Sequence, residues 1–169
     1  MIVQEDKEAF VNLIQENRRI IYKIGNGYCK NKDDIEDLAQ EIIYQLWRSW
    51  SSFDARYKFT TWMYRIALNV AISFYRKDSK RKDRHAPLTE HFIDIADDNE
   101  HGELETNIHL LQQFINELKV LDKALMILYL EENSYREIGE ILGITETNVA
   151  TKVGRIKEKL KQKFETINK

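Results

Sequence analysis

The chain has few of the residues that cross-link or interrupt small folds. Among its 169 residues are one cysteine, one proline and six glycines. The single cysteine, Cys29, excludes an internal disulfide and any site built from several cysteines. So few glycines and prolines favour helix over a β fold rich in turns. No apolar run is long enough to span a bilayer, and we therefore expect no membrane insertion.

Targeting and catalytic signatures are also missing. The start, MIVQEDKEAF, lacks the basic and apolar stretches of a signal peptide, which favours a cytoplasmic protein. The four histidines, His85, His91, His101 and His109, lack metal-ligand spacing, so we expect neither metal nor cofactor. Glycine loops for phosphate, nucleophile elbows and Cys–His pairs are absent, which argues against an enzyme.

Charge is distributed unevenly although the net charge is only −2. Residues 73–85 carry six Lys or Arg against two acids, and residues 150–169 carry seven against two. Residues 86–106, between them, carry seven acids and no Lys or Arg. Two basic segments with an acidic connector suggest two nucleic-acid contacts on one chain, although solvated helix faces would look similar.

Helical periodicity runs through most of the chain. It predicts a first helix over about 7–29. A second helix is expected to start at Asp33, with Glu36 completing a capping box. A third is expected to start at Thr60 or Thr61 and to continue into the basic run that ends at residue 84. A further helical block starts near Asn107. The sequence therefore predicts an all-α protein of two small domains, 1–85 and 107–169, joined by a flexible acidic linker at 86–106.

The segment SYREIGEILGITETNVATKVGR, residues 134–155, has the layout of a helix-turn-helix. Ser134 and Glu137 form a capping box, Gly143 suits a left-handed turn, and Thr145 caps the next helix. The outward positions of that helix are short, polar or cationic, a composition that suits base edges and phosphates. They are Glu146, Thr147, Asn148, Ala150, Thr151, Lys152 and Arg155. An ordinary αα-hairpin is the alternative.

Aromatic and basic residues alternate in the loop and helix over 53–77. Rings beside cations suit single-stranded nucleic acid, because bases stack on rings while Lys and Arg hold phosphates. Trp62 also suits a place in the core. Upstream, Asp34, Asp37 and Glu41 share one helix face. That face suits a basic partner; a solvated surface and a two-carboxylate hydrolase are the alternatives.

These motifs carry a resemblance to a family. Residues 33–77, DDIEDLAQEIIYQLWRSWSSFDARYKFTTWMYRIALNVAISFYRK, resemble the promoter-melting domain of bacterial sigma factors of the extracytoplasmic-function (ECF) type in the sigma-70 family. Residues 134–160 are similar to the second DNA-binding domain of the same family. Many relatives carry Leu-Pro before the helix that leads to this motif, where Leu118-Lys119 stands here.

The resemblance implies partners and roles. The acidic helix would dock on the clamp helices of the largest subunit of core RNA polymerase. The polymerase-binding residues would be Asp34, Asp37, Gln40 and Glu41, with Leu38 and Trp47 packing behind or beside them. The aromatic-basic segment would recognise and melt the −10 element and capture the single-stranded non-template strand. Its assigned residues are Phe53, Arg56, Lys58, Thr60, Thr61, Trp62, Arg65, Asn69, Arg76 and Lys77.

The second domain would read the duplex −35 element. The assigned residues are Thr147, Asn148, Ala150, Thr151, Lys152 and Arg155, with Arg136 on a phosphate. Family members are often held by an anti-sigma factor, which joins the expected partners. The alternative function is a stand-alone dimeric helix-turn-helix regulator that binds duplex DNA without polymerase.

Overall fold

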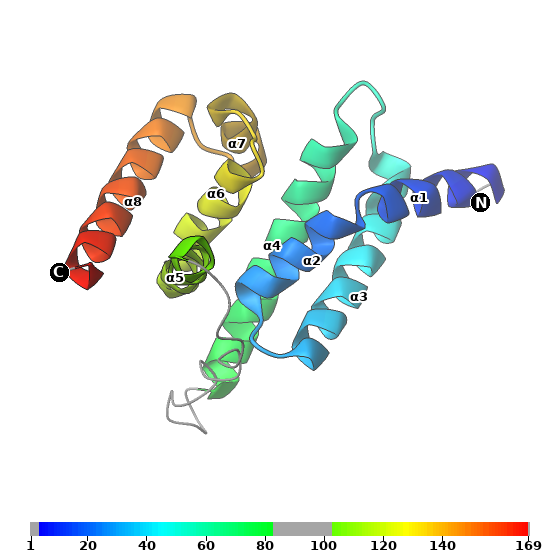
Figure 1. Cartoon of the computed structure of the whole chain (residues 1–169). Helices are drawn as coiled ribbons and strands as arrows, with labels where there is room; N and C mark the ends of the chain where they lie inside the picture. Colours follow the sequence, from blue (N-terminus) through cyan, green and yellow to red (C-terminus); the bar gives the residue numbers. More distant parts are fainter. Residues whose placement is uncertain (1–3, 83–102, 169) are drawn as a thin grey trace.

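The computed structural model describes residues 4–82 and 103–168, and within these ranges all regular structure is helical (Figure 1). The α-helices are α1 (Gln4–Glu16), α2 (Arg18–Tyr28), α3 (Lys32–Ser49), α4 (Phe59–Lys82), α5 (Glu103–Glu117), α6 (Val120–Leu130), α7 (Tyr135–Leu142) and α8 (Glu146–Ile167). A short 3-10 turn, η1 (Trp50–Ser52), follows α3. This confirms the all-α prediction.

Helices α1 to α4 form the first unit. Their apolar stripes meet in a core that includes Ile24, Leu38, Ile42, Leu46 and Met63, all fully buried. Burying side chains of this size supplies about 1.5–3 kcal/mol each, which is the main source of stability for such a bundle. Helix α4 packs on both α2 and α3 and forms the side of the unit nearer to α5–α8 (Figure 1).

The first predicted helix is two helices in the structure. The chain bends at Asn17, whose side-chain Nδ2 donates a hydrogen bond to the Leu13 carbonyl at 2.9 Å. A side-chain amide that bonds the backbone competes with the helical ladder. The bend turns α1 so that Phe10 contacts Trp47, with ring centroids 5.0 Å apart. The predicted continuous helix over 7–29 was therefore wrong, although its inward residues are buried as expected.

The start of α3 also differs from the prediction. Asn31, not Asp33, is the N-cap, and its Oδ1 accepts a hydrogen bond from the Asp34 amide at 2.8 Å. Glu36 therefore lies one turn inside the helix and takes no part in the cap.

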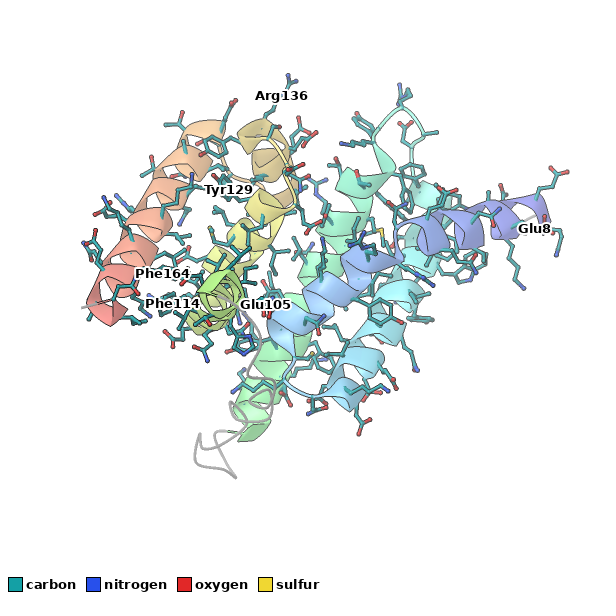
Figure 2. The ribbon with its side chains drawn as sticks, in the orientation of Figure 1. Glu8, Glu105, Phe114, Tyr129, Arg136 and Phe164 are labelled. Atoms are coloured by element: carbon teal, nitrogen blue, oxygen red, sulfur yellow. The ribbon has the colours of Figure 1, made fainter. Side chains whose placement is uncertain are left out.

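Helices α5 to α8 form the second unit. The predicted single block after Asn107 divides between Glu117 and Val120, at the dipeptide Leu118-Lys119. Helix α5 already begins at Glu103, so the predicted linker ends sooner than residue 106. The remainder of that linker, residues 86–102, lies outside the described residues. Phe114 and Phe164 make an edge contact at 5.3 Å that holds α5 against α8 (Figure 2).

The two units pack against each other. Contacts run between α4 and α7, between α2 and α6, and between α4 and α6. Buried side chains from both units belong to one continuous apolar cluster. The sequence analysis did not predict this contact.

Candidate nucleic-acid interface

The helix-turn-helix forms as its end signals predict. The Ser134 hydroxyl accepts a hydrogen bond from the Glu137 amide at 3.1 Å, and Glu137 Oε2 accepts one from the Ser134 amide at 3.0 Å. Gly143 ends α7 with a φ of 72°, a left-handed conformation that glycine adopts without strain. Thr145 then caps α8 by accepting a hydrogen bond from the Asn148 amide at 3.1 Å. These bonds fix the angle between α7 and α8.

Helix α8 has a buried face and an exposed face. Val149, Val153 and Ile156 are buried against α6 and α7. The predicted outward residues are exposed, except that Lys152 is half-buried; they are Glu146, Thr147, Asn148, Ala150, Thr151, Lys152 and Arg155. The first turns of α8 therefore present a row of small polar and cationic groups, the arrangement by which such a helix reads a major groove.

Arg136 lies at the first turn of α7 and projects from its end (Figure 2). Its side chain is 80% exposed, and its Nε lies 3.5 Å from Glu140 Oε1 one turn later. An exposed ion pair of this kind is worth less than about 1 kcal/mol, so it yields readily to a phosphate. This geometry fits the phosphate-contacting position that the resemblance assigns to it.

The aromatic residues before and within α4 pack on one another. Phe53 stacks on Trp50 at 5.4 Å and contacts Trp62 at 5.0 Å and Phe59 at 5.7 Å. Phe53 and Trp62 are each half-buried, so one part of each ring is held in the cluster while another part faces solvent. Rings fixed in this way offer a preformed stacking surface.

The cations of this segment fall into two groups. Arg76 and Lys77 are exposed in the second half of α4, and Asn69 is exposed about two turns before them. Thr60 and Thr61 are half-buried at the start of α4. The remaining three cations, Arg56, Lys58 and Arg65, already contact acceptors.

Arg56, Lys58 and Arg65 each have a partner in this structure. Arg56 pairs with Asp54 two residues earlier, at 2.6 Å. Lys58 Nζ lies 3.4 Å from Glu137 Oε1, and Arg65 donates a hydrogen bond to the backbone carbonyl of Glu140 at 2.9 Å. The last two acceptors belong to α7, in the other unit. Sequence reasoning missed these contacts, because no local pattern links residues so far apart in the chain.

The acidic face of α3 is exposed as predicted. Asp37, Gln40 and Glu41 are open to solvent, and Glu41 accepts a hydrogen bond from Gln45 at 2.9 Å. Asp34 is half-buried beside the Asn31 cap. Leu38, however, is 0% exposed. It packs behind this face and holds it in position, so direct contact between Leu38 and a partner is excluded in this conformation.

A shallow apolar groove lies beside the acidic face, between α1 and α3. Its volume is about 340 Å³, and it is lined by Lys7, Phe10, Val11, Gln40, Ile43, Tyr44 and Trp47. Val11 is 42% exposed and Tyr44 is 56% exposed. Sequence analysis assigned Gln40 and Trp47 to a docking surface but missed Val11 and Tyr44, because the bend at Asn17 is what brings α1 beside α3.

Neither a metal centre nor a membrane span is found in the described part of the chain. Residues 4–82 and 103–168 contain no group of three or more His, Cys, Asp or Glu that is able to hold a metal ion. None of the helices in those ranges is long and apolar enough to cross a bilayer.

Comparisons with known proteins place both units in one family. Residues 13–81 match the model for sigma-70 region 2, and residues 108–160 match that for sigma-70 region 4. The chain is 32% identical to the ECF RNA polymerase sigma factor SigW of Bacillus subtilis (strain 168), over 94% of this chain and 90% of the relative. It is 27% identical to the ECF RNA polymerase sigma-E factor of Haemophilus influenzae, over 98% and 93%.

Solved structures share the fold. The sigma factor RpoE of Bartonella quintana, in complex with the anti-sigma factor NepR, matches with a TM-score of 0.74 at 17% identity, over 94% of this chain and 98% of that one. CnrH, in complex with the cytosolic domain of CnrY, matches with a TM-score of 0.69 at 17% identity, over 95% and 90%. With regions 2 and 4 both matched, and with a relative above 30% identity along nearly the whole length, the chain belongs to the ECF RNA polymerase sigma factors of the sigma-70 family.

Proposed function

We propose that this chain binds core RNA polymerase and directs it to promoters through two DNA-reading surfaces, one in each unit. The observation that carries the proposal is the pairing of a capped helix-turn-helix with a helix that combines exposed cations and fixed aromatic rings. Both surfaces lie on one chain, in the order of sigma-70 regions 2 and 4. The chain supplies recognition and strand capture, and polymerase supplies the phosphoryl chemistry.

Helix α3 is the proposed docking element for polymerase. Asp37, Gln40 and Glu41 present an acidic, hydrogen-bonding strip, and Asp34 extends it toward the start of the helix. Trp47 and the neighbouring groove add apolar surface at the other end. An acidic strip beside an apolar patch suits a partner surface on which a basic strip lies beside an apolar patch. Charge complementarity of this kind also speeds association.

The segment from Phe53 to Lys77 is the proposed −10 surface. Half-exposed Phe53 and Trp62 are positioned to stack on an unpaired base. Lys58, Arg65, Arg76 and Lys77 would hold the phosphates on either side, and Arg56, Thr60, Thr61 and Asn69 complete the polar part of the surface. Stacking contributes about 1–3 kcal/mol per base, which helps to offset the cost of separating the strands.

The exposed face of α8 is the proposed −35 reader. Asn148 and Lys152 have side chains that reach base edges, and Arg136 anchors the register through a phosphate. Thr147, Thr151 and Arg155 flank them, while Ala150 offers only a methyl group to the groove. The net charge of the whole chain is near neutral. This fits a chain that binds DNA together with polymerase, because polymerase then contributes much of the electrostatic attraction for DNA.

Further partners and the cellular location follow from the same proposal. An anti-sigma factor is the kind of protein that is bound in the solved structure of the Bartonella quintana relative, and we expect one for this chain. Its place of action is then the cytoplasm, with polymerase. A stand-alone dimeric regulator finds no support among the relatives, which are sigma factors.

Reconstituted transcription tests the proposal. Purified core polymerase with this chain should initiate at discrete sites on fragmented genomic DNA, and core alone should not. If duplex fragments bind the chain tightly without core, and adding core yields no specific transcript, the regulator is the better description. A pull-down on core polymerase in the same preparation shows whether docking occurs.

A further inference from the structure

Tyr57 is the exposed aromatic residue of the −10 surface. It is 69% exposed and lies between Arg56 and Lys58 in the turn before α4. We propose that the ring of Tyr57 stacks on the base captured from the non-template strand, and that Asp54 is the residue that positions this ring. This role rests on the proposed function, which assigns the −10 surface but neither of these two residues.

The other rings of this surface are already engaged with one another. Phe53 contacts three rings, those of Trp50, Phe59 and Trp62. Trp62 also contacts Trp50 at 6.1 Å and Phe59 at 5.6 Å. Tyr57 takes part in none of the ring contacts found among residues 4–82 and 103–168. A base that leaves the duplex therefore meets a fixed wall of packed rings and one further ring that is unoccupied.

Asp54 forms the turn that carries Tyr57. The Asp54 carbonyl accepts a hydrogen bond from the Tyr57 amide at 3.0 Å, and Asp54 Oδ1 accepts one from the Arg56 amide at 3.0 Å. Both bonds are typical of an aspartate at the first position of a tight turn. They fix the backbone of Tyr57 and leave only its two side-chain torsions free. A ring held in this way loses little entropy when a base stacks on it.

Arg56 clamps the same carboxylate from the other side of the turn. Its Nη2 lies 2.6 Å from Asp54 Oδ2, and its Nε lies 3.0 Å from that oxygen. The hydrogen bonds from the Arg56 side chain lower the pKa of Asp54, so the carboxylate stays ionised and the clamp stays closed. The charge of Arg56 also neutralises an acid that would otherwise repel the DNA strand beside Tyr57.

The surroundings of Tyr57 favour a nucleic-acid base as its partner. A single exposed tyrosine is ordinary on a protein surface. Here, however, the ring stands on a fixed turn, with the exposed cation Lys58 next to it and the packed rings of the −10 surface within a few residues on either side. Rings beside cations suit single-stranded nucleic acid, and a ring stacks on any base. Tyr57 therefore contributes to the capture of a base and not to the choice of base.

Binding of fork-junction DNA to core polymerase reconstituted with the full chain tests the ring. The probe is taken from a promoter found in the transcription assay, with its −10 element present only as the non-template strand. Tyr57→Ala should weaken binding by about 5- to 150-fold, because stacking contributes about 1–3 kcal/mol per base. Tyr57→Phe keeps the ring and should bind like wild type.

Tyr22→Ala is the matched control for this measurement. Tyr22 is also an exposed tyrosine, at 51%, but it lies on α2, outside the −10 surface. Its replacement should leave binding of the probe unchanged. If Tyr57→Ala binds as tightly as Tyr22→Ala, or if Tyr57→Phe is as weak as Tyr57→Ala, stacking by Tyr57 is wrong.

Probes with one abasic site each then locate the base. At the captured position, Tyr57→Ala should cost nothing further, because the ring and the base belong to one contact and the two losses do not add. At every other position of the −10 strand the two losses should add. Additive losses at all positions would contradict the stacking of Tyr57 on a captured base.

The positioning role of Asp54 is tested through its dependence on Tyr57. Asp54→Ala should weaken binding of the fork probe when Tyr57 is present and have no further effect in the Tyr57→Ala chain. Asp54→Asn keeps an oxygen that accepts from the Arg56 amide, so it should recover most of the binding. A loss of equal size in both backgrounds, or no loss in either, would show that Asp54 does not act through Tyr57.

Failure of this role and failure of the proposed function give different results. A chain that directs core polymerase to discrete starts, but whose binding of the probe is indifferent to Tyr57→Ala, keeps its function and loses only the role of Tyr57. A chain that never yields specific starts with core polymerase loses the function, and the role of Tyr57 with it.

Discussion

Gly139, in the middle of α7, is where the helix-turn-helix is most sensitive to a single methyl group. It is buried, and a Cβ built on it would lie 2.7 Å from the backbone oxygen of Ile144, where ordinary contacts begin at 3.4 Å. The turn must therefore shift, and restoring an ordinary contact requires 0.7 Å, the difference between those two distances. The obstacle is backbone in the turn that positions Thr145 as the cap of α8, so no side-chain rotation relieves it.

The expected cost of Gly139→Ala follows from two opposing terms. Overpacking against fixed backbone costs about 1–3 kcal/mol. The intrinsic preference of a helix for alanine over glycine returns about 1 kcal/mol. The net is a destabilisation of up to about 2 kcal/mol, with a distortion of the angle between α7 and α8. Promoter recognition should suffer more than stability, because base contacts depend on that angle.

Gly154→Ala is the matched control. Gly154 lies in the interior of α8, and a Cβ there meets nothing within 4 Å. The same substitution should therefore stabilise the unit by about 1 kcal/mol. For a chain of 169 residues whose units share one apolar cluster, about 1 kcal/mol shifts the melting temperature by roughly 2–4 °C. The two variants should therefore move in opposite directions.

Thermal unfolding followed by circular dichroism, with initiation from a promoter found in the reconstituted assay, checks both variants. Gly139→Ala should melt below wild type and lose initiation, and Gly154→Ala should melt above wild type and keep it. A Gly139→Ala protein as stable and as active as wild type would refute the packing of α7 on the turn as described.

Three further predictions concern the separate surfaces. Replacing Asp37 and Glu41 together by Lys should abolish binding to core polymerase in a pull-down while leaving the melting temperature within about 1 °C, since both are exposed; unchanged binding would refute the docking assignment. Asn148→Ala should relax preference at −35 positions, whereas Arg136→Ala should weaken all promoters alike by about 1 kcal/mol in competition assays; uniform loss from Asn148→Ala would argue against base readout. The Ser134 amide and Lys58 hold the pKa of Glu137 below its usual value, so the stabilisation by the Glu137 carboxylate should be complete above pH 4.5 and should fall as the pH drops and the carboxylate is protonated. Glu137→Gln should reduce this loss of melting temperature at low pH, measured in melts from pH 3 to 7. An equal loss in the variant and the wild type would contradict the prediction.

Signals within a few residues were enough to predict the helix-turn-helix. Ser134, Gly143 and Thr145 act on their own backbone neighbours, and each forms the cap or turn that its residue type favours. The buried faces followed from periodicity for the same reason. The start of α3 was ambiguous, because Asn31 and Asp33 are both good N-caps, each with a carboxylate three residues on, and only the structure chooses between them.

Features that depend on distant contacts could not be predicted. The bend at Asn17 has no proline or glycine to signal it, and it is stabilised by Phe10 packing on Trp47 and Trp50. Leu38, by contrast, lies on the apolar stripe of α3, so its burial behind the acidic face followed from periodicity. The pairing of Lys58 with Glu137 joins residues of different units, and no periodicity in the sequence links them.

The most direct test of two-surface promoter recognition is the sequence upstream of the transcription starts made by core polymerase with this chain on genomic DNA. Aligned starts should share two conserved blocks at a nearly constant spacing. The doubly substituted chain, Asn148→Ala with Lys152→Ala, should erase the upstream block and leave the downstream one. Starts that share no block, or a single block that survives this change unaltered, would contradict the account.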